Sequence, residues 1–289
     1  MMVIDEIFRM GLKHIKSGFP CEDFAISGYM DNIKHGYIAI SDGCSGSNGM
    51  TDIGARLWCM AYLNTLKKSN IDELFLDEDF VMRIMNEFHK ITMLPNRYDE
   101  TASLLMLLAN ENNIQFLIFG DGGYAIEKND GTIELVEFSW YKNKPYYPIF
   151  KLEEDKRDNS ELMKYFREKD IPIMKKETKI FKKKKKGLSQ YTYDMIDKNI
   201  KGYFFEDVEF GYNKIISVKK EEVKSISVFS DGLWTVQKES LNNIVEEIIE
   251  TKENKEYGFL KSKIVPIFEN WHKTNKYPLD DFSMGKIIF

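Results

Sequence analysis

Short apolar runs that end in Asp-Gly are the feature that most constrains this chain. The run Ile38-Ala39-Ile40 predicts a strand, and Asp42-Gly43 follows it after a single serine. The same arrangement recurs further along the chain, at Asp231-Gly232 after Ser225 to Phe229 and at Gly120-Asp121-Gly122 after Ile114 to Phe119. A carboxylate pair, Asp280-Asp281, precedes the last apolar run, Phe282 to Phe289. Aspartates at four strand ends indicate one site drawn from distant parts of the chain.

Carboxylates of this kind are the ligands that Mg²⁺ or Mn²⁺ prefers, and such ions activate water for hydrolysis. Zinc is a poor candidate because the chain has no cysteine-histidine cluster and only four histidines. Any single Asp-Gly pair is more often a simple turn. Four together favour a metal site, since carboxylates gathered at one sheet edge repel one another unless cations lie among them.

Composition limits the classes of partner and compartment. The chain has 289 residues and a net charge of -5, which gives no general attraction to nucleic acid or acidic membranes. Three cysteines, Cys21, Cys44 and Cys59, form no metal-type pairing and indicate a reducing compartment. The start of the chain lacks the apolar block of a signal peptide, and no apolar run approaches the ~20 residues of a membrane span. We therefore expect a cytoplasmic protein that makes no use of nucleic acid or membrane.

Periodicity predicts the elements. Helices are expected over 51–66, 72–94, 240–250 and 258–274, and strands over 24–27, 38–40, 102–109, 114–119, 124–128, 133–138, 215–218, 225–230 and 284–289. Residues 139–212 lose the pattern and are interpreted as a partly ordered insertion in a single domain that covers residues 1–289. Closely spaced hairpins favour antiparallel sheets. The expected fold class is α+β, with two antiparallel β-sheets flanked by helices in a four-layer α-β-β-α sandwich.

Two other phosphate chemistries are excluded by spacing. A cysteine phosphatase places an arginine six residues after its nucleophile, but Ser27, Met50 and Thr65 occupy those positions. The glycines from Gly43 to Gly49 are too far apart for a nucleotide-binding loop, and Met50 replaces its lysine.

The order of motifs resembles the metal-dependent protein phosphatases of type 2C (PPM family), in particular their compact bacterial branch. Six segments carry the resemblance across most of the chain: His14 to Asp23, Asp42 to Gly46 with Gly54-Ala55, Glu100 to Ser103, Gly120 to Gly122, Ser230 to Trp234, and Asp280 to Ser283.

The resemblance implies the following roles. Asp42 bridges two Mn²⁺ or Mg²⁺ ions, the Gly43 carbonyl binds one of them, and Asp231 and Asp280 hold the other. Glu22 and Asp23 bind waters on the ions and orient the nucleophile. The choice of Asp280 over Asp281 rests on the position of the ligand in the motif, because Asp281 stands where relatives usually have Asn.

Three departures from the family's pattern bear on activity. Gly18 stands where many relatives have a phosphate-gripping arginine, so Lys16 or His14 would substitute for it. Thr235 replaces an aspartate that in relatives helps Asp121 to hold a third ion, so Asp121 binds that ion weakly or not at all. Cys44, which replaces a histidine or methionine, is interpreted as a packing residue.

These observations predict a phosphatase that acts on phosphoserine or phosphothreonine in proteins through a water bridging two ions, with a cognate Ser/Thr kinase as a further partner. The alternative is a phosphatase-like module that binds phosphoproteins without cleaving them, which the changes at positions 18 and 235 favour. Nucleic-acid binding through 175–186 is the weakest alternative. The run Lys182 to Lys186 is interpreted as a solvated tip of the family's flap, with substrate docking as a second possibility.

Overall fold

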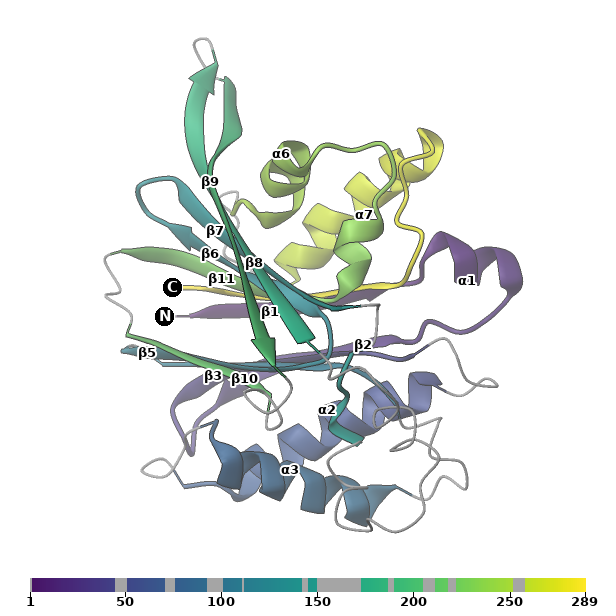
Figure 1. The fold of residues 1–289 in the computed structure, drawn as a ribbon, viewed down its shortest axis with the longest axis vertical. Coiled ribbons are helices and arrows are strands. Elements are labelled where there is room, and N and C mark those ends of the chain that lie inside the picture. Colours follow the sequence, from purple (N-terminus) through teal and green to yellow (C-terminus); the bar gives the residue numbers. More distant parts are fainter. Residues whose placement is uncertain are drawn as a thin grey trace.

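The computed structural model describes residues 2–44, 51–70, 76–92, 101–110, 112–141, 145–149, 173–186, 190–204, 211–217, 222–251 and 258–289. Two antiparallel sheets lie face to face, and helices cover the outer face of each, so that four layers follow one another (Figure 1). The predicted α-β-β-α sandwich is therefore confirmed. The two chain ends lie beside each other at one edge of the sheets (Figure 1).

The larger sheet has seven strands in the order β1-β12-β11-β6-β7-β8-β9. Their bounds are β1 Val3–Arg9, β6 Gly122–Lys128, β7 Thr132–Trp140, β8 Ile173–Lys186, β9 Gln190–Phe204, β11 Val223–Phe229 and β12 Phe282–Ile288. The smaller sheet has five strands in the order β10-β5-β4-β3-β2. Its members are β2 Asp23–Met30, β3 His35–Asp42, β4 Leu104–Ala109, β5 Asn113–Phe119 and β10 Tyr212–Ser217. Both inner faces are buried, which explains why β4 and β12 are apolar along most of their length.

Helices α2 (Thr51–Lys68) and α3 (Glu78–Ile91) cover the smaller sheet (Figure 1). Trp58 and Phe88 stack between them, with ring centroids 3.7 Å apart. The second helix is shorter than the predicted 72–94, because Asp77 caps it by accepting a hydrogen bond from the backbone N–H of Phe80. Residues 72–75 and 93–94 of that prediction lie outside the described residues.

The other sheet is covered by α6 (Leu241–Ile244), the π-helical turn η6 (Val245–Ile249) and α7 (Phe259–Lys273) (Figure 1). Phe268 and Trp271 of α7 are buried, and Phe268 packs on Phe282 of β12 with ring centroids 5.1 Å apart. A short helix, α1 (Leu12–Ser17), follows β1 and was not predicted, because Gly11 and Gly18 enclose a segment of only six residues.

The lysine run is exposed at Lys182, Lys184 and Lys185, as predicted, but it is not a loop. Lys182 to Lys186 form the end of β8, which pairs with β9 in a long hairpin at the edge of the larger sheet (Figure 1). Several lysines of β8 make ion pairs: Lys179 with Glu137 and Glu177, Lys183 with Glu250, and Lys184 with Asp194. The strand was missed because most of these acidic partners, namely Glu137, Asp194 and Glu250, lie outside β8. The flap role of 139–212 and the single domain stay predictions.

Among the described residues, no helix is both long and apolar enough to cross a membrane.

Gly285 of β12 lies at a close contact between the two sheets. A Cβ at this position would lie 2.2 Å from Cγ2 of Ile38 in β3. We expect Gly285→Ala to lower the free energy of unfolding by about 1–3 kcal/mol through overpacking. Ile38→Ala removes the opposing atom and should itself cost about 2–5 kcal/mol.

Urea denaturation of the two single variants and the double variant measures the coupling between these positions. The double variant should be more stable than the sum of the single effects predicts, because the methyl group added at position 285 then fills part of the space that the Ile38 side chain leaves. Strictly additive losses would show that the two sheets do not meet at this point.

Candidate active site

Strand pairing brings three of the predicted acidic motifs to one end of the larger sheet. The strand β11 runs antiparallel to both β6 and β12. The end of β11, where Asp231 follows, therefore lies beside the starts of β6 and β12, where Asp121 and Asp280 precede the strands. Positive φ angles at Gly120 (83°) and Gly122 (121°) shape the turn that carries Asp121, and glycine adopts such angles most readily. The indole N–H of Trp140 fastens this turn by donating to the Gly120 carbonyl over 2.8 Å.

The smaller sheet contributes the other acids. Asp23 at the start of β2 stands directly opposite Asp42 at the end of β3 in the antiparallel register. The backbone of Asp42 is fixed on its other side by Ser103, whose hydroxyl accepts from the Asp42 N–H (3.1 Å) and whose N–H donates to the Asp42 carbonyl (2.8 Å). The N–H of Gly43 donates to the carbonyl of Glu22 over 3.2 Å, which holds the two acidic motifs together.

Electrostatic coupling shows that the carboxylates of the two sheets form one cluster. Burial, then the negative charges of Asp23 and Asp231, raise the pKa of Asp42 well above its usual value. Burial, then Asp231, raise the pKa of Asp121 to about 7. The pKa of Asp231 is raised by burial and by Asp280, although a hydrogen bond shared with Asp42 lowers it in part. Asp42 and Asp231, which lie 189 positions apart in the chain, therefore meet in space.

Asp23 is oriented by two serines. The Ser230 hydroxyl donates to Oδ2 of Asp23 over 2.7 Å and accepts from the backbone N–H of Ser283 over 2.9 Å. The other carboxylate oxygen, Oδ1, is buried without a hydrogen-bond partner among the described residues. Burial raises the pKa of Asp23 to about 7, although the hydrogen bond from Ser230 lowers it in part. Asp23 therefore holds a carboxyl group whose charge state changes near neutral pH, with one oxygen available to a ligand.

Asp281 serves a different purpose from Asp280. It is 2% exposed and accepts hydrogen bonds from the backbone N–H groups of Gly11 and Glu22, each over 2.5 Å. Nδ1 of His14 lies 2.7 Å from Oδ2 of Asp281, and its Nε2 lies 3.5 Å from Oε2 of Glu22. His14 is thus buried between two carboxylates, a contact that suits a positioning residue better than a phosphate ligand. Asp281 ties the first motif to the last.

Among the cations of α1, Lys13 lies closest to the cluster, a residue that sequence reasoning missed. Its ammonium group is 3.0 Å from Oδ2 of Asp280, and its charge lowers the pKa of Asp231. Lys16, by contrast, is exposed and makes no ion pair or side-chain hydrogen bond within the part of the chain that the structure describes. Gly18 ends α1 in the left-handed region (φ 73°), a conformation that glycine adopts most readily.

The Thr235 hydroxyl is already used for structure. It accepts from the Asp280 N–H over 3.1 Å and donates to the Gly232 carbonyl over 2.9 Å, so it joins the 3₁₀ helix η5 (Asp231–Thr235) to the last motif. A Cβ at Gly232 would lie 1.8 Å from the Asp281 carbonyl oxygen, which explains the glycine after Asp231. Thr235 therefore supports Asp280 rather than an ion beside Asp121.

Tyr147 is a second residue that sequence reasoning missed. Burial, then the neighbouring Asp121, Cys44 and Asp42, raise the pKa of its hydroxyl well above the usual value. A neutral phenol beside the cluster can donate a hydrogen bond to an anion. It was missed because it belongs to the irregular segment after Trp140. Ser45, Gly46 and Glu100 of the predicted motifs lie outside the described residues.

The donor set fits divalent cations that prefer oxygen. It consists of carboxylates, and Oδ1 of Asp23 has no hydrogen-bond partner among the described residues. A cation would neutralise the excess negative charge of the cluster. Within the described residues, no group of three or more Asp, Glu, His or Cys side chains is arranged to hold an ion as it stands. Binding would therefore require small side-chain rotations that bring the carboxylates to a shared ion, which their mutual repulsion otherwise opposes.

Comparisons with known proteins agree with this geometry. A family profile described as protein phosphatase 2C matches residues 10–269, which is most of the chain, although it ends before Asp280. A search of curated proteins finds no match.

Several solved structures share the fold. The S. agalactiae serine/threonine phosphatase superposes with a TM-score of 0.55 at 14% identity, covering 100% of this chain and 99% of that one. The serine/threonine phosphatase Stp1 from Staphylococcus aureus gives 0.56 at 11%, covering 100% and 95%. The phosphatase domain of SpoIIE from Bacillus subtilis, with a fragment of its regulatory domain, gives 0.51 at 12%, covering 100% and 63%.

The profile match, together with the order of the acidic motifs and the sandwich fold, shows that the chain belongs to the protein phosphatase 2C family and carries its serine/threonine phosphatase domain.

Proposed function

We propose that this protein hydrolyses phosphoserine and phosphothreonine in protein substrates, with two Mn²⁺ or Mg²⁺ ions as cofactors. The observation that supports this most strongly is the meeting of Asp42 and Asp231, from different sheets, in one partly buried carboxylate cluster. Two divalent ions in such a cluster would polarise the phosphoryl oxygens and lower the pKa of the attacking water.

The chain's own groups divide the remaining work. Asp42, Asp231, Asp280 and the Gly43 carbonyl would hold the ions, with Asp121 as a weaker additional ligand. Asp23, whose Oδ1 lacks a hydrogen-bond partner among the described residues, would orient the nucleophilic water and accept its proton, because its pKa of about 7 suits proton transfer near neutral pH. Glu22 would help Asp23 to orient this water. It contacts Nε2 of the His14 ring, on the side opposite the contact with Asp281.

Phosphate capture falls to different residues from those that the resemblance suggested. Lys13 is the cation closest to the carboxylates and is 59% exposed, so it can release Asp280 and contact a substrate phosphate. Lys16 and His14 are less suited, because one is exposed without a contact to the cluster and the other is buried between Asp281 and Glu22. A location in the cytoplasm and a cognate Ser/Thr kinase stay predictions.

A binding module without catalysis remains the competing function, because Thr235 has replaced an acidic residue and uses its hydroxyl within the protein. Nucleic-acid binding is disfavoured, since the net charge is -5 and three of the β8 lysines, Lys179, Lys183 and Lys184, pair with acidic side chains.

Hydrolysis of an aryl phosphate and of a phosphothreonine peptide in the presence of Mn²⁺ separates these functions. We expect turnover by the unaltered protein and a loss of about 100-fold or more in Asp42→Asn, because a ligand shared by two ions is removed. Asp31→Asn is the matched control, since Asp31 lies in the turn at the other end of the same hairpin. Peptide binding without product would instead identify a binding module.

Manganese titrations of activity can decide between Asp280 and Asp281. Asp280→Asn should raise the Mn²⁺ concentration needed for half-maximal activity by roughly 10–100-fold. Asp281→Asn should instead lower the free energy of unfolding by about 1.5–3 kcal/mol, because charged hydrogen bonds to Gly11 and Glu22 are lost, with little change in the Mn²⁺ requirement. The reverse pattern would assign Asp281 as the ligand.

Stability without divalent ions should depend on pH in a predictable direction. The folded protein holds Asp23 and Asp121 at pKa values of about 7, above the ordinary value of 3.8, so between these values it binds more protons than the unfolded chain. The contribution of both groups to stability is therefore full below pH 3.8 and is lost as pH rises towards 7.

Thermal unfolding of the metal-free protein and of Asp121→Asn, from about pH 5 to about pH 7.5, tests this dependence. The variant should lose less stability than the unaltered protein as pH rises. At the upper pH, Mn²⁺ should restore the stability that the unaltered protein has lost. Parallel curves, or no effect of Mn²⁺ on unfolding, would contradict the proposed cluster.

A further inference from the structure

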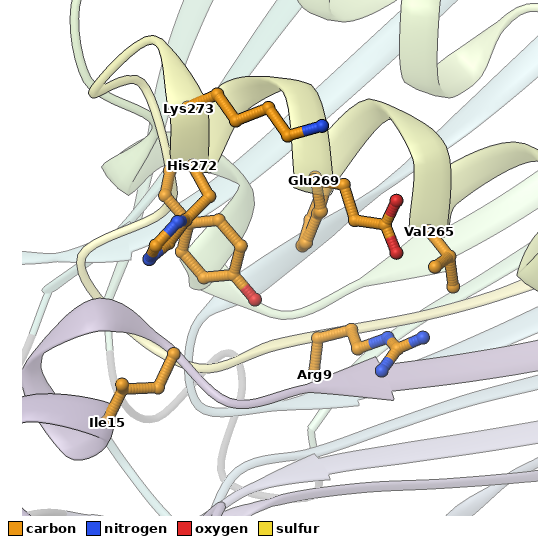
Figure 2. A pocket seen from close by; sticks show the side chains of 8 residues that line it. Arg9, Ile15, Val265, Glu269, His272 and Lys273 are labelled. Carbon is orange, nitrogen blue, oxygen red and sulfur yellow. The ribbon is translucent and has the colours of Figure 1, made fainter.

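A second pocket, separate from the carboxylate cluster, lies where β1, α1 and the C-terminal half of α7 meet (Figure 2). Its volume is about 340 Å³, which is at the lower end of the range for small-molecule sites. None of the acidic residues proposed to hold metal lines it. The size favours a metabolite over a peptide segment.

Opposite charges stand at one end of this pocket. The guanidinium of Arg9 on β1 and the carboxylate of Glu269 on α7 face each other across it (Figure 2). Within the described residues, neither side chain makes an ion pair or a hydrogen bond, although Arg9 is partly buried. A planar guanidinium without an acceptor is suited to bind a carboxylate through two hydrogen bonds. Lys273, on the rim, adds positive charge on the same side of the molecule.

Apolar and aromatic groups form the rest of the wall. Phe268 is buried, and Tyr277 packs against it edge to face with ring centroids 5.3 Å apart. The Tyr277 hydroxyl donates to the Met10 carbonyl over 3.1 Å, which fixes the ring in place. Ile15 of α1, 46% exposed, and His272 stand at the end away from the Arg9–Glu269 pair (Figure 2). This end can cover an apolar side chain.

We propose that this pocket binds a free α-amino acid with an apolar or aromatic side chain. Its carboxylate would pair with Arg9, its ammonium group with Glu269, and its side chain would lie against Phe268, Tyr277 and Ile15. A simple anion would be repelled by the negative charge of Glu269, and a simple cation would be repelled by the positive charge of Arg9. A zwitterion can pair with both residues. The complementary charges and the apolar wall together define the ligand class.

The position of α1 connects this pocket to the carboxylate cluster. Ile15 lines the pocket, while the two residues before it contact the cluster, Lys13 at Asp280 and His14 at Asp281 and Glu22. A ligand held against Ile15 stabilises one position of this helix of six residues. Occupancy therefore changes the phosphatase activity, an effect that rests on the function proposed above.

Isothermal titration calorimetry of the full chain with L-phenylalanine tests the binding site. We expect saturable binding to one site, with at least tenfold weaker binding of L-phenylalaninamide, which lacks the carboxylate, and of 3-phenylpropionate, which lacks the ammonium group. Equal binding of 3-phenylpropionate would overturn the claim that the pocket recognises both charges of the ligand. Failure of L-phenylalanine to bind would overturn the proposed site.

Variants locate the ligand. Arg9→Met keeps the apolar stem and Glu269→Gln keeps the shape, and each should weaken L-phenylalanine binding at least tenfold. Lys261→Met, an exposed lysine of α7 that does not line the pocket, is the control and should bind normally. Melting curves by circular dichroism show whether Arg9→Met is folded. Normal binding by folded Arg9→Met would overturn the assignment.

The effect of the bound amino acid on phosphatase activity is measured separately. Aryl phosphate hydrolysis with Mn²⁺ should change at least twofold on saturation with L-phenylalanine, and folded Arg9→Met should keep the basal rate while losing this response. Binding without any change in rate would overturn the coupling alone. If the protein has no basal activity, the proposed function fails while the binding result stands.

Discussion

Repulsion among buried carboxylates is the constraint on which the rest of this structure depends. Asp23 is buried, and Asp42, Asp121 and Asp231 are half-buried; all four have raised pKa values, because each is shielded from water and each lies near at least one other acid. Such a cluster destabilises a fold unless protons or cations neutralise it. The protein retains the cluster and places donors beside it, namely the buried Ser230 hydroxyl and the exposed cation Lys13. This arrangement is characteristic of a site that binds positive charge.

The sandwich fold is the device that holds the acids together against this repulsion. Each sheet is stabilised along its whole length by pairing and by a buried inner face, while the acids occupy only one end. The absence of a side chain at Gly285 and Gly232 lets the sheets and the motif loops approach each other closely. Asp281 then attaches α1 and the start of β2 to the same end. Packing elsewhere thus offsets the electrostatic cost of the site.

Local patterns were enough to predict most strands and the residues of the cluster, because an apolar run that stops at Asp-Gly reports both a strand end and a carboxylate. Helices α2 and α3 followed from periodicity. The hairpin of β8 and β9 could not be predicted, since its lysines look solvated until Glu137 and Glu250 are placed beside them. Lys13 and Tyr147 were missed for the same reason: their significance comes from neighbours far away in the chain. The roles of Asp280 and Asp281 could be separated only by their hydrogen bonds.

The central claim is that carboxylates from both sheets share a pair of divalent ions. Anomalous diffraction from crystals soaked in Mn²⁺ tests it most directly, because manganese positions are located without reference to activity. The account predicts manganese peaks at the cluster, with Asp42 in contact with both ions and Asp231 and Asp280 in contact with one. Saturating Mn²⁺ without a peak at Asp42, or with peaks only elsewhere on the molecule, would contradict it.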